Sequence, residues 1–203
     1  MKKTKDTTTE MRILNAAKTI FERKGMDGAR MQEIADEAGI NKALLHYYFR
    51  SKQLLFEAVF KNLFFSFSPK LRHILNNSPS CFTAIELFTK NYIAFVSEHP
   101  FLPNFIIHEL NRNPEFITTL ISKEHFPTIS KFKLQVLEEI DKGIIKPIKP
   151  EQLFANVIAL CAFPFVAAPL LKAMLEFNDT TYKQFLDSRK TEIATFIINS
   201  IKA

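Results

Sequence analysis

Glycine is scarce in this sequence, with only four in a chain of 203 residues. No segment alternates β-branched with polar residues, as a half-buried strand would. Apolar residues recur instead at spacings of three and four, which is the period of an amphipathic helix. The sequence therefore predicts an all-α protein.

Cysteine is also rare, and Cys81 and Cys161 lack the spacing of a metal site or a redox motif. We expect both to be small buried residues in a reducing compartment. The five histidines are scattered, no glycine-rich loop could hold a phosphate, and no nucleophile has an adjacent base. These absences argue against an enzyme and predict neither a cofactor nor a metal site.

Long apolar runs are missing as well. The longest, Val157 to Leu171, has 15 residues and contains Pro164 and Pro169, whereas a helix needs roughly 20 apolar residues to span a bilayer. The N-terminal stretch has no apolar signal-peptide segment. We therefore expect a cytoplasmic protein with no membrane partner.

Three short helices are predicted in the first 50 residues, after a flexible basic tail over 1–8. Thr7 and Glu10 have the spacing of a capping box at the first helix, and Gly25 is a natural stop for it. A second helix begins near Met31 and stops at Gly39, and Asn41 is a good N-cap for a third that runs to about Phe49. Two helices joined by a glycine turn indicate a helix-turn-helix domain, which we place at 9–55.

A larger helical domain is predicted over 56–203, beyond a fourth helix that Ser51 caps and that ends before Pro69. Proline, asparagine and serine clusters then divide the chain. The helices expected between these clusters lie near 81–97, 101–111, 114–122, 126–143, 150–175 and 180–202.

The third helix has more large side chains than one buried face can hold. Leu45 and Phe49 are four residues apart and can pack on the second helix, which leaves the other face free. An outer face with small, aromatic and cationic side chains suits the major groove of DNA. That outer set is Lys42, Ala43, His46 and Tyr47, flanked by Leu44 and Tyr48, with Arg50 and Lys52 beyond it to neutralise phosphates. The alternative is that His46, Tyr47 and Tyr48 pack between the third and fourth helices.

The stretch from Met31 to Phe60 closely resembles the DNA-binding core of tetracycline-repressor-like (TetR family) transcription regulators. The positions that match their pattern are Ile34, Ala35, Ala38, Gly39, Ile40, Leu45, Tyr48, Phe49, Lys52 and Leu55. By this resemblance, Gln32 can reach a base edge, Arg30, Arg50 and Lys52 contact phosphates, and the groove-facing set is the one given above. Arg30 stands where the family usually has a Thr or Ser cap, and His46 replaces a common Tyr.

Aromatic residues are concentrated in the second part of the chain, where 14 of the 21 phenylalanines follow residue 80. Aromatic residues that recur at helical spacing usually belong to an ordinary hydrophobic core. The resemblance implies a small-molecule pocket among these helices, and an aromatic-lined pocket would suit a hydrophobic or planar effector. Its candidate residues are Phe88, Tyr92, Phe95, Phe105, His108 and Glu109.

The last two predicted helices, 150–175 and 180–202, are too apolar for a solvated surface. The family resemblance implies that they pair with their copies in a homodimer, which would place two reading helices on a palindromic operator. The function expected is that of a transcriptional repressor released from double-stranded DNA by a small ligand. The alternative is a helical small-molecule sensor that does not bind DNA.

Overall fold

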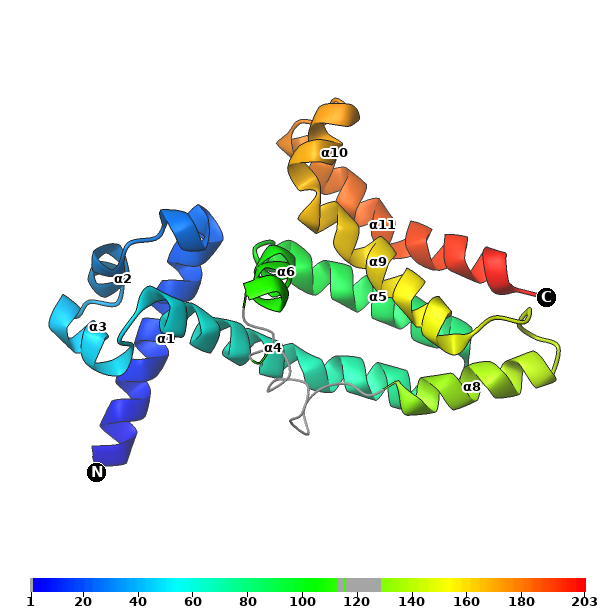
Figure 1. Cartoon of the computed structure of the whole chain (residues 1–203), viewed down its shortest axis with the longest axis horizontal. Helices are drawn as coiled ribbons and strands as arrows, with labels where there is room; N and C mark the ends of the chain where they lie inside the picture. The colour runs from blue at the N-terminus through cyan, green and yellow to red at the C-terminus, as the bar shows by residue number, and fades with distance from the viewer. Residues whose placement is uncertain (1, 113–114, 116–128) are drawn as a thin grey trace. The chain divides into compact units, whose positions relative to one another are not determined.

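A computed structural model describes residues 2–112, 115 and 129–203 (Figure 1). Helices make up the regular structure of this part of the chain, and its one β-type feature is an isolated bridge between Ile145 and Lys202. The all-α prediction is confirmed. The chain forms two compact units, residues 1–66 and 67–203. The domain boundary between residues 55 and 56 that the sequence suggests stays a prediction.

The first unit contains α1 (Lys2–Gly28), α2 (Met31–Glu37), α3 (Lys42–Tyr48) and the beginning of α4 (Lys52–Asn77). The helices share one apolar core, in which the rings of Phe21 and Phe56 meet edge to face with centroids 4.5 Å apart. Other fully buried side chains of this unit include Phe60, Ile13, Ala17, Ile20, Ile34, Ala35, Leu45 and Leu55. Among these, Leu45 was predicted from its spacing to pack inward.

Two helix ends in this region differ from the prediction. Helix α1 begins at Lys2, so Thr7 lies inside the helix and is not its N-cap. No glycine or proline interrupts residues 2–24, and the helix continues until Gly25 breaks its geometry at φ +67°. Helix α4 runs through Pro69 to Asn77 because buried residues on both sides, Leu63 and Leu71, favour continuing it.

The second unit is built around α5 (Cys81–Glu98), which makes its most extensive contact with α11 (Asp179–Ile201). Helices α8 (Ser130–Asp141) and α9 (Pro150–Val166) also pack on α5, and α6 (Leu102–Arg112) packs on α9. Cys81 and Cys161 are free and buried in this core, as predicted. The helices expected at 114–122 and at the start of 126–143 lie outside the described residues.

The helix predicted over 150–175 is two helices. Helix α9 ends at Val166, α10 (Ala168–Met174) follows, and the pair is bent by 76°. Among the described residues no single helix is long and apolar enough to cross a membrane, and only this bent pair reaches that length and composition when taken together. Pro164 lies inside α9, and Pro169 lies in the first turn of α10, where proline is well tolerated.

Candidate nucleic-acid interface

Helix α3 has a defined beginning and end. The side chain of Asn41 accepts a hydrogen bond from the backbone N–H of Leu44 at 2.8 Å, so the predicted N-cap is confirmed. At the other end the backbone N–H of Phe49 donates to the carbonyl of Leu45 at 2.8 Å. The helix is therefore only seven residues long, and its position depends on what holds its two ends.

The turn between α2 and α3 is fixed by Gly39 and by a side chain from α1. Gly39 has φ +62°, a conformation that other residues rarely adopt. Arg12 donates through Nη2 to the carbonyl of Ala38 at 2.6 Å and, more weakly, to that of Gly39 at 3.4 Å. A Cβ atom at position 39 would lie 3.1 Å from this nitrogen. We did not predict the role of Arg12, because nothing in its local pattern marks a bond to residues 26 positions away.

One face of α3 is anchored and the other is open. Leu45 is fully buried and Phe49 nearly so, as the sequence predicted. Opposite them Tyr47 is 80% exposed. The other outward side chains of α3 are Lys42, Ala43, Leu44 and His46. Tyr48 is half-buried, and its ring meets that of Tyr47 edge to face at 5.6 Å. The exposure of His46 and Tyr47 argues against their packing between the third and fourth helices.

The predicted phosphate contacts divide into two kinds. Arg30 and Arg50 are exposed, and Arg30 precedes α2 without a capping side-chain bond, as expected. Lys52 is engaged instead: its Nζ donates to the carbonyls of Asp27 at 3.2 Å and Ala29 at 3.1 Å. It closes the end of α1 against the start of α4, a structural role that we did not predict from the sequence.

Two pairs of polar side chains involve residues of α2. Gln32, predicted to reach a base edge, donates through Nε2 to Asp36 Oδ1 at 2.8 Å. Lys24 Nζ lies 2.8 Å from Glu33 Oε1, and this hydrogen bond lowers the pKa of the Glu33 carboxyl. Both pairs are exposed, so water and salt screen them and each contributes little to stability.

The aromatic residues predicted to line a ligand pocket pack on one another. Phe88 is 2% exposed, and its ring stacks on Tyr92 and meets Phe154 edge-on, both with centroids 5.8 Å apart. The rings of Phe95 and Phe67 stack at 3.9 Å. Burial, with a smaller contribution from Cys161, raises the pKa of the Tyr92 hydroxyl well above its usual range. These three aromatic contacts are core packing in the free protein.

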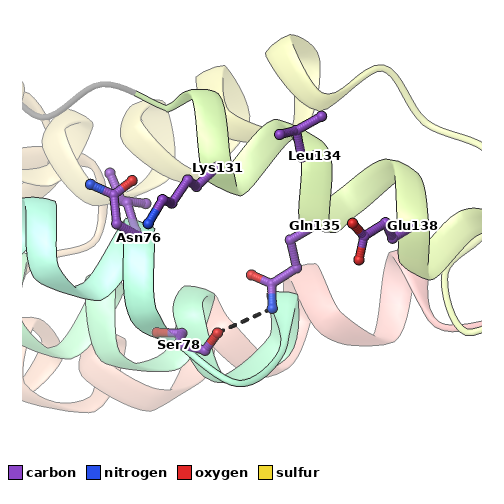
Figure 2. Close-up of a pocket in the computed structure, with 7 residues that line it drawn as sticks. Asn76, Ser78, Lys131, Leu134, Gln135 and Glu138 are labelled. Carbon is purple, nitrogen blue, oxygen red and sulfur yellow. Dashed lines mark hydrogen bonds between the residues drawn. The ribbon is translucent and has the colours of Figure 1, made fainter.

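The other predicted pocket residues lie on α6. Phe105 and Glu109 are buried, whereas His108 is largely exposed, and its Nδ1 lies 3.3 Å from Oε1 of Glu109. A defined surface hollow lies elsewhere, between the end of α4 and α8 (Figure 2). Gln135 Nε2 donates there to the carbonyl of Ser78 at 3.2 Å. The lining residues are Leu75, Asn76, Ser78, Lys131, Leu134, Gln135 and Glu138, so the predicted pocket residues do not line it.

Within the described residues, no group of three or more His, Cys, Asp or Glu side chains is arranged to hold a metal ion. A short helix with one buried face, set by a glycine turn against a second helix and presenting aromatic and cationic side chains outward, defines a helix-turn-helix protein. Residues 13–59 match the sequence profile described as "Bacterial regulatory proteins, tetR family". By sequence, residues 13–59 therefore carry the domain that defines this family, as the resemblance predicted.

Two curated relatives are similar over most of this chain. The transcriptional repressor NicS of Pseudomonas putida is 27% identical over 146 residues, which are 69% of this chain and 61% of that protein. The chain thus spans about three fifths of this relative's length. IcaR of Staphylococcus aureus, a negative regulator of the biofilm operon icaADBC, is 27% identical over 73% of this chain and 77% of its own. Both relatives are transcriptional regulators and not enzymes.

Solved structures support the fold. A crystal structure of a TetR/AcrR-family transcriptional regulator from Thermobifida fusca aligns over 91% of this chain and 96% of its own, with a TM-score of 0.64. The sequence identity is 16%. At that identity the likeness establishes the arrangement of helices and nothing about what is bound.

Proposed function

We propose that this protein is a sequence-specific DNA-binding transcriptional repressor that inserts α3 into the major groove. The observation that carries the proposal is the outer face of α3, where Lys42, His46 and Tyr47 are exposed while Leu45 anchors the helix from behind. The major groove admits an α-helix, and its base edges present hydrogen-bond acceptors and thymine methyl groups.

Each outward side chain has a contact suited to its chemistry. Lys42, in the first turn of α3, reaches a guanine edge or a phosphate, and the Tyr47 hydroxyl donates to an acceptor of the same groove. Ala43 and Leu44 meet thymine methyl groups. Arg30 and Arg50 bind phosphates, since neither side chain is buried. Lys52 and Gln32 join the interface only by exchanging the partners that they hold in the free protein.

A second copy of the chain completes the operator-binding form. Helices α9, α10 and α11, together with Leu175 just after α10, expose large apolar side chains that a solvated surface rarely gathers. Those on the helices are Phe163, Leu170, Met174 and Phe196. We propose that these helices form the homodimer interface. Two copies related by a twofold axis present two α3 helices, so the operator is a palindrome with half-sites about one helical turn or a multiple apart.

Selection of binding sites from random duplex DNA tests the proposal. The purified full chain should enrich a palindrome, and affinity for it should fall steeply with salt because bound phosphates release counterions. Binding that is weak, independent of sequence and insensitive to salt would instead support a helical sensor without DNA function. Lys70→Ala is the matched control for Lys42→Ala, because it also removes one cation but from an exposed position of α4 outside the proposed interface.

Release by a small hydrophobic effector is part of the same proposal. The region around Phe88, Tyr92, Phe95, Phe105, His108 and Glu109 would have to open to admit it, because its rings are packed in the free protein. An effector that binds there should raise the melting temperature and weaken operator binding together. Planar and aliphatic compounds can be screened by both measurements. A panel that stabilises the protein without releasing DNA would contradict this effector mechanism.

A further inference from the structure

Helix α9 contains a proline where its backbone would otherwise be continuous. Pro164 has no N–H, so the carbonyl of Leu160, four residues earlier, loses its partner within the helix. A buried carbonyl without a partner is costly, and it is normally satisfied from elsewhere. Here the bend between α9 and α10 falls at Ala167, three residues after the proline.

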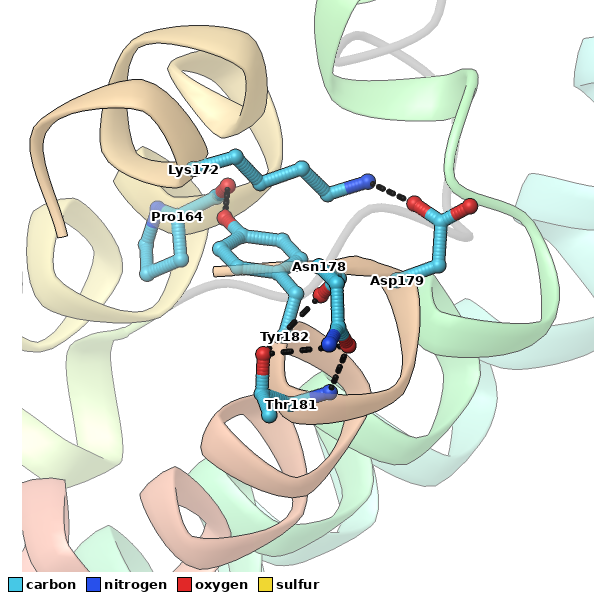
Figure 3. Close-up of polar contacts among 6 residues, drawn as sticks. All are labelled: Pro164, Lys172, Asn178, Asp179, Thr181 and Tyr182. Atoms are coloured by element: carbon cyan, nitrogen blue, oxygen red, sulfur yellow. Dashed lines mark hydrogen bonds and ion pairs between the residues drawn. The ribbon is translucent and has the colours of Figure 1, made fainter. Parts of the chain in front are cut away.

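Helix α11 supplies that partner and a second contact beside it. Arg189 Nη2 donates to the carbonyl of Leu160 at 2.9 Å, and the Tyr182 hydroxyl donates to the carbonyl of Pro164 (Figure 3). Tyr182 and Arg189 are seven residues apart, nearly two turns, so they project from the same face of α11. The two carbonyls are themselves one helical turn apart. One face of α11 therefore meets one short stretch of α9.

Neighbouring side chains hold these two donors in place. The guanidinium of Arg189 lies 5.4 Å from the ring centre of Phe185, and burial lowers the Arg189 pKa. On the other side of the bend, Lys172 of α10 lies over the Tyr182 ring at 5.1 Å and pairs with Asp179 at 2.7 Å, as Figure 3 shows for the ion pair. Both helices that meet at the bend are thus tied to α11.

We propose that Arg189 and Tyr182 are positioning residues that fix the bend between α9 and α10 by holding the carbonyls around Pro164. The bend in turn sets the relative placement of Phe163 on α9 and of Leu170 and Met174 on α10, which are exposed on either side of it. For this second step the inference rests on the proposed homodimer, whose apolar surface it shapes. The first step holds for a single chain.

A double-mutant cycle between Arg189→Met and Pro164→Ala tests the first step. Methionine keeps an apolar stem beside Phe185 but cannot donate, so it should raise the unfolding equilibrium constant about tenfold, the cost of one unsatisfied carbonyl. Alanine at 164 restores an N–H four residues after Leu160, so in that background Arg189→Met should change the constant less than about threefold. Equal effects in both backgrounds would overturn the proposal, because an arginine that merely packs is indifferent to residue 164.

Two further variants refine the cycle. Arg189→Lys keeps a donor and should recover most of the loss, whereas a recovery no better than that of methionine would count against carbonyl binding. Lys183→Met removes a cation from an exposed position of the same helix and should leave the unfolding constant unchanged. A loss equal to that of Arg189→Met would show that charge, and not the Leu160 carbonyl, is responsible.

Sedimentation of the same full-length variants tests the second step. Arg189→Met and Tyr182→Phe should each weaken the dimer about tenfold, and Pro164→Ala should suppress the effect of the former. A dimer whose dissociation constant is unchanged, despite coupling in the unfolding cycle, would refute the link to the interface. A wild-type chain that sediments as a monomer would refute the proposed dimer and this second step, while the unfolding cycle would still decide the first step.

Discussion

Helices α3 and α5 both carry aromatic residues that the sequence predicted to be binding residues, but those of α3 are exposed and those of α5 are mostly buried. Tyr47 on α3 is 80% exposed, whereas Phe88 on α5 is 2% exposed. Helix α3 has seven residues and one of them fully buried, so its remaining side chains have no core to enter. Helix α5 has 18 residues and packs against α8, α9 and α11. Its aromatic side chains are therefore buried between these helices.

The comparison shows that the number of helices packed on a helix decides whether its aromatic side chains are buried or exposed. A ring on a helix packed on several sides contributes apolar burial, and a ring on a helix held from one side stays available to a ligand. Substitutions in the two helices should therefore separate stability from DNA binding, and the largest separation is expected at the two rings themselves.

Phe88→Ala should lower the free energy of unfolding by about 3–5 kcal/mol, because it leaves a cavity among Tyr92 and Phe154. Tyr47→Ala is the matched change on α3 and should alter it by less than about 0.5 kcal/mol. Urea denaturation followed by circular dichroism measures both. Similar losses for the two variants would show that Tyr47 is packed and would remove the contrast.

Operator binding should show the opposite order. Lys42→Ala and Tyr47→Ala should each weaken binding to the selected operator by about 1–3 kcal/mol, which is roughly fivefold to 150-fold, since each removes a groove contact. Fluorescence anisotropy with the operator and a scrambled duplex gives the specific part. If both variants bind the operator as the wild type does, the outward face of α3 is not the DNA-binding face.

The caps of the two helices provide a matched pair of smaller effects. Asn41 caps α3 by accepting from Leu44, and Ser80 caps α5 by accepting from Thr83 at 3.1 Å. Replacing either by alanine should cost about 1 kcal/mol of stability. Only Asn41→Ala should also weaken operator binding, because it loosens the entry of α3. Loss of DNA binding in Ser80→Ala would mean that general destabilisation explains both.

The smallest effect expected is a pH dependence beside α3. The Glu33 pKa is lowered by the hydrogen bond from Lys24, so the stabilisation is present above the ordinary carboxyl pKa and is lost as the pH falls through the lowered value. Lys24→Met should remove this part of the acid sensitivity, with a small change because the pair is exposed. Melting temperatures between about pH 6 and pH 3 measure it, and identical profiles for the two proteins would exclude it.

Local signals account for what the sequence predicted well. The Asn41 cap, the left-handed Gly39 and the buried pair Leu45 and Phe49 each depend on residues at most four positions away. The spacing of Leu45 and Phe49 also predicted the outward face of α3, to which the family resemblance added Arg30 and Gln32. The sequence misled at Pro69, because a proline argues for a helix end unless tertiary packing on both sides outweighs it.

Bonds to distant backbone carbonyls were not predictable in the same way. Arg12, Lys52 and Arg189 each donate to carbonyls more than 20 residues away. Neither composition nor spacing distinguishes these cations from exposed ones, because a carbonyl acceptor is present at every residue. The proposed pocket failed to stand out for a related reason: apolar periodicity is the same whether rings enclose a ligand or each other.

The contact between Arg12 and the turn restricts which sequences this domain tolerates. A side chain at position 39 would meet Arg12 Nη2 at 3.1 Å and would also have to adopt φ +62°. A shorter residue at position 12 would relieve this close approach but not the left-handed backbone, so glycine is favoured at position 39 whatever residue stands at 12. Shortening Arg12 would also remove its bond to the Ala38 carbonyl, so the costs of the two substitutions should add and neither should compensate for the other.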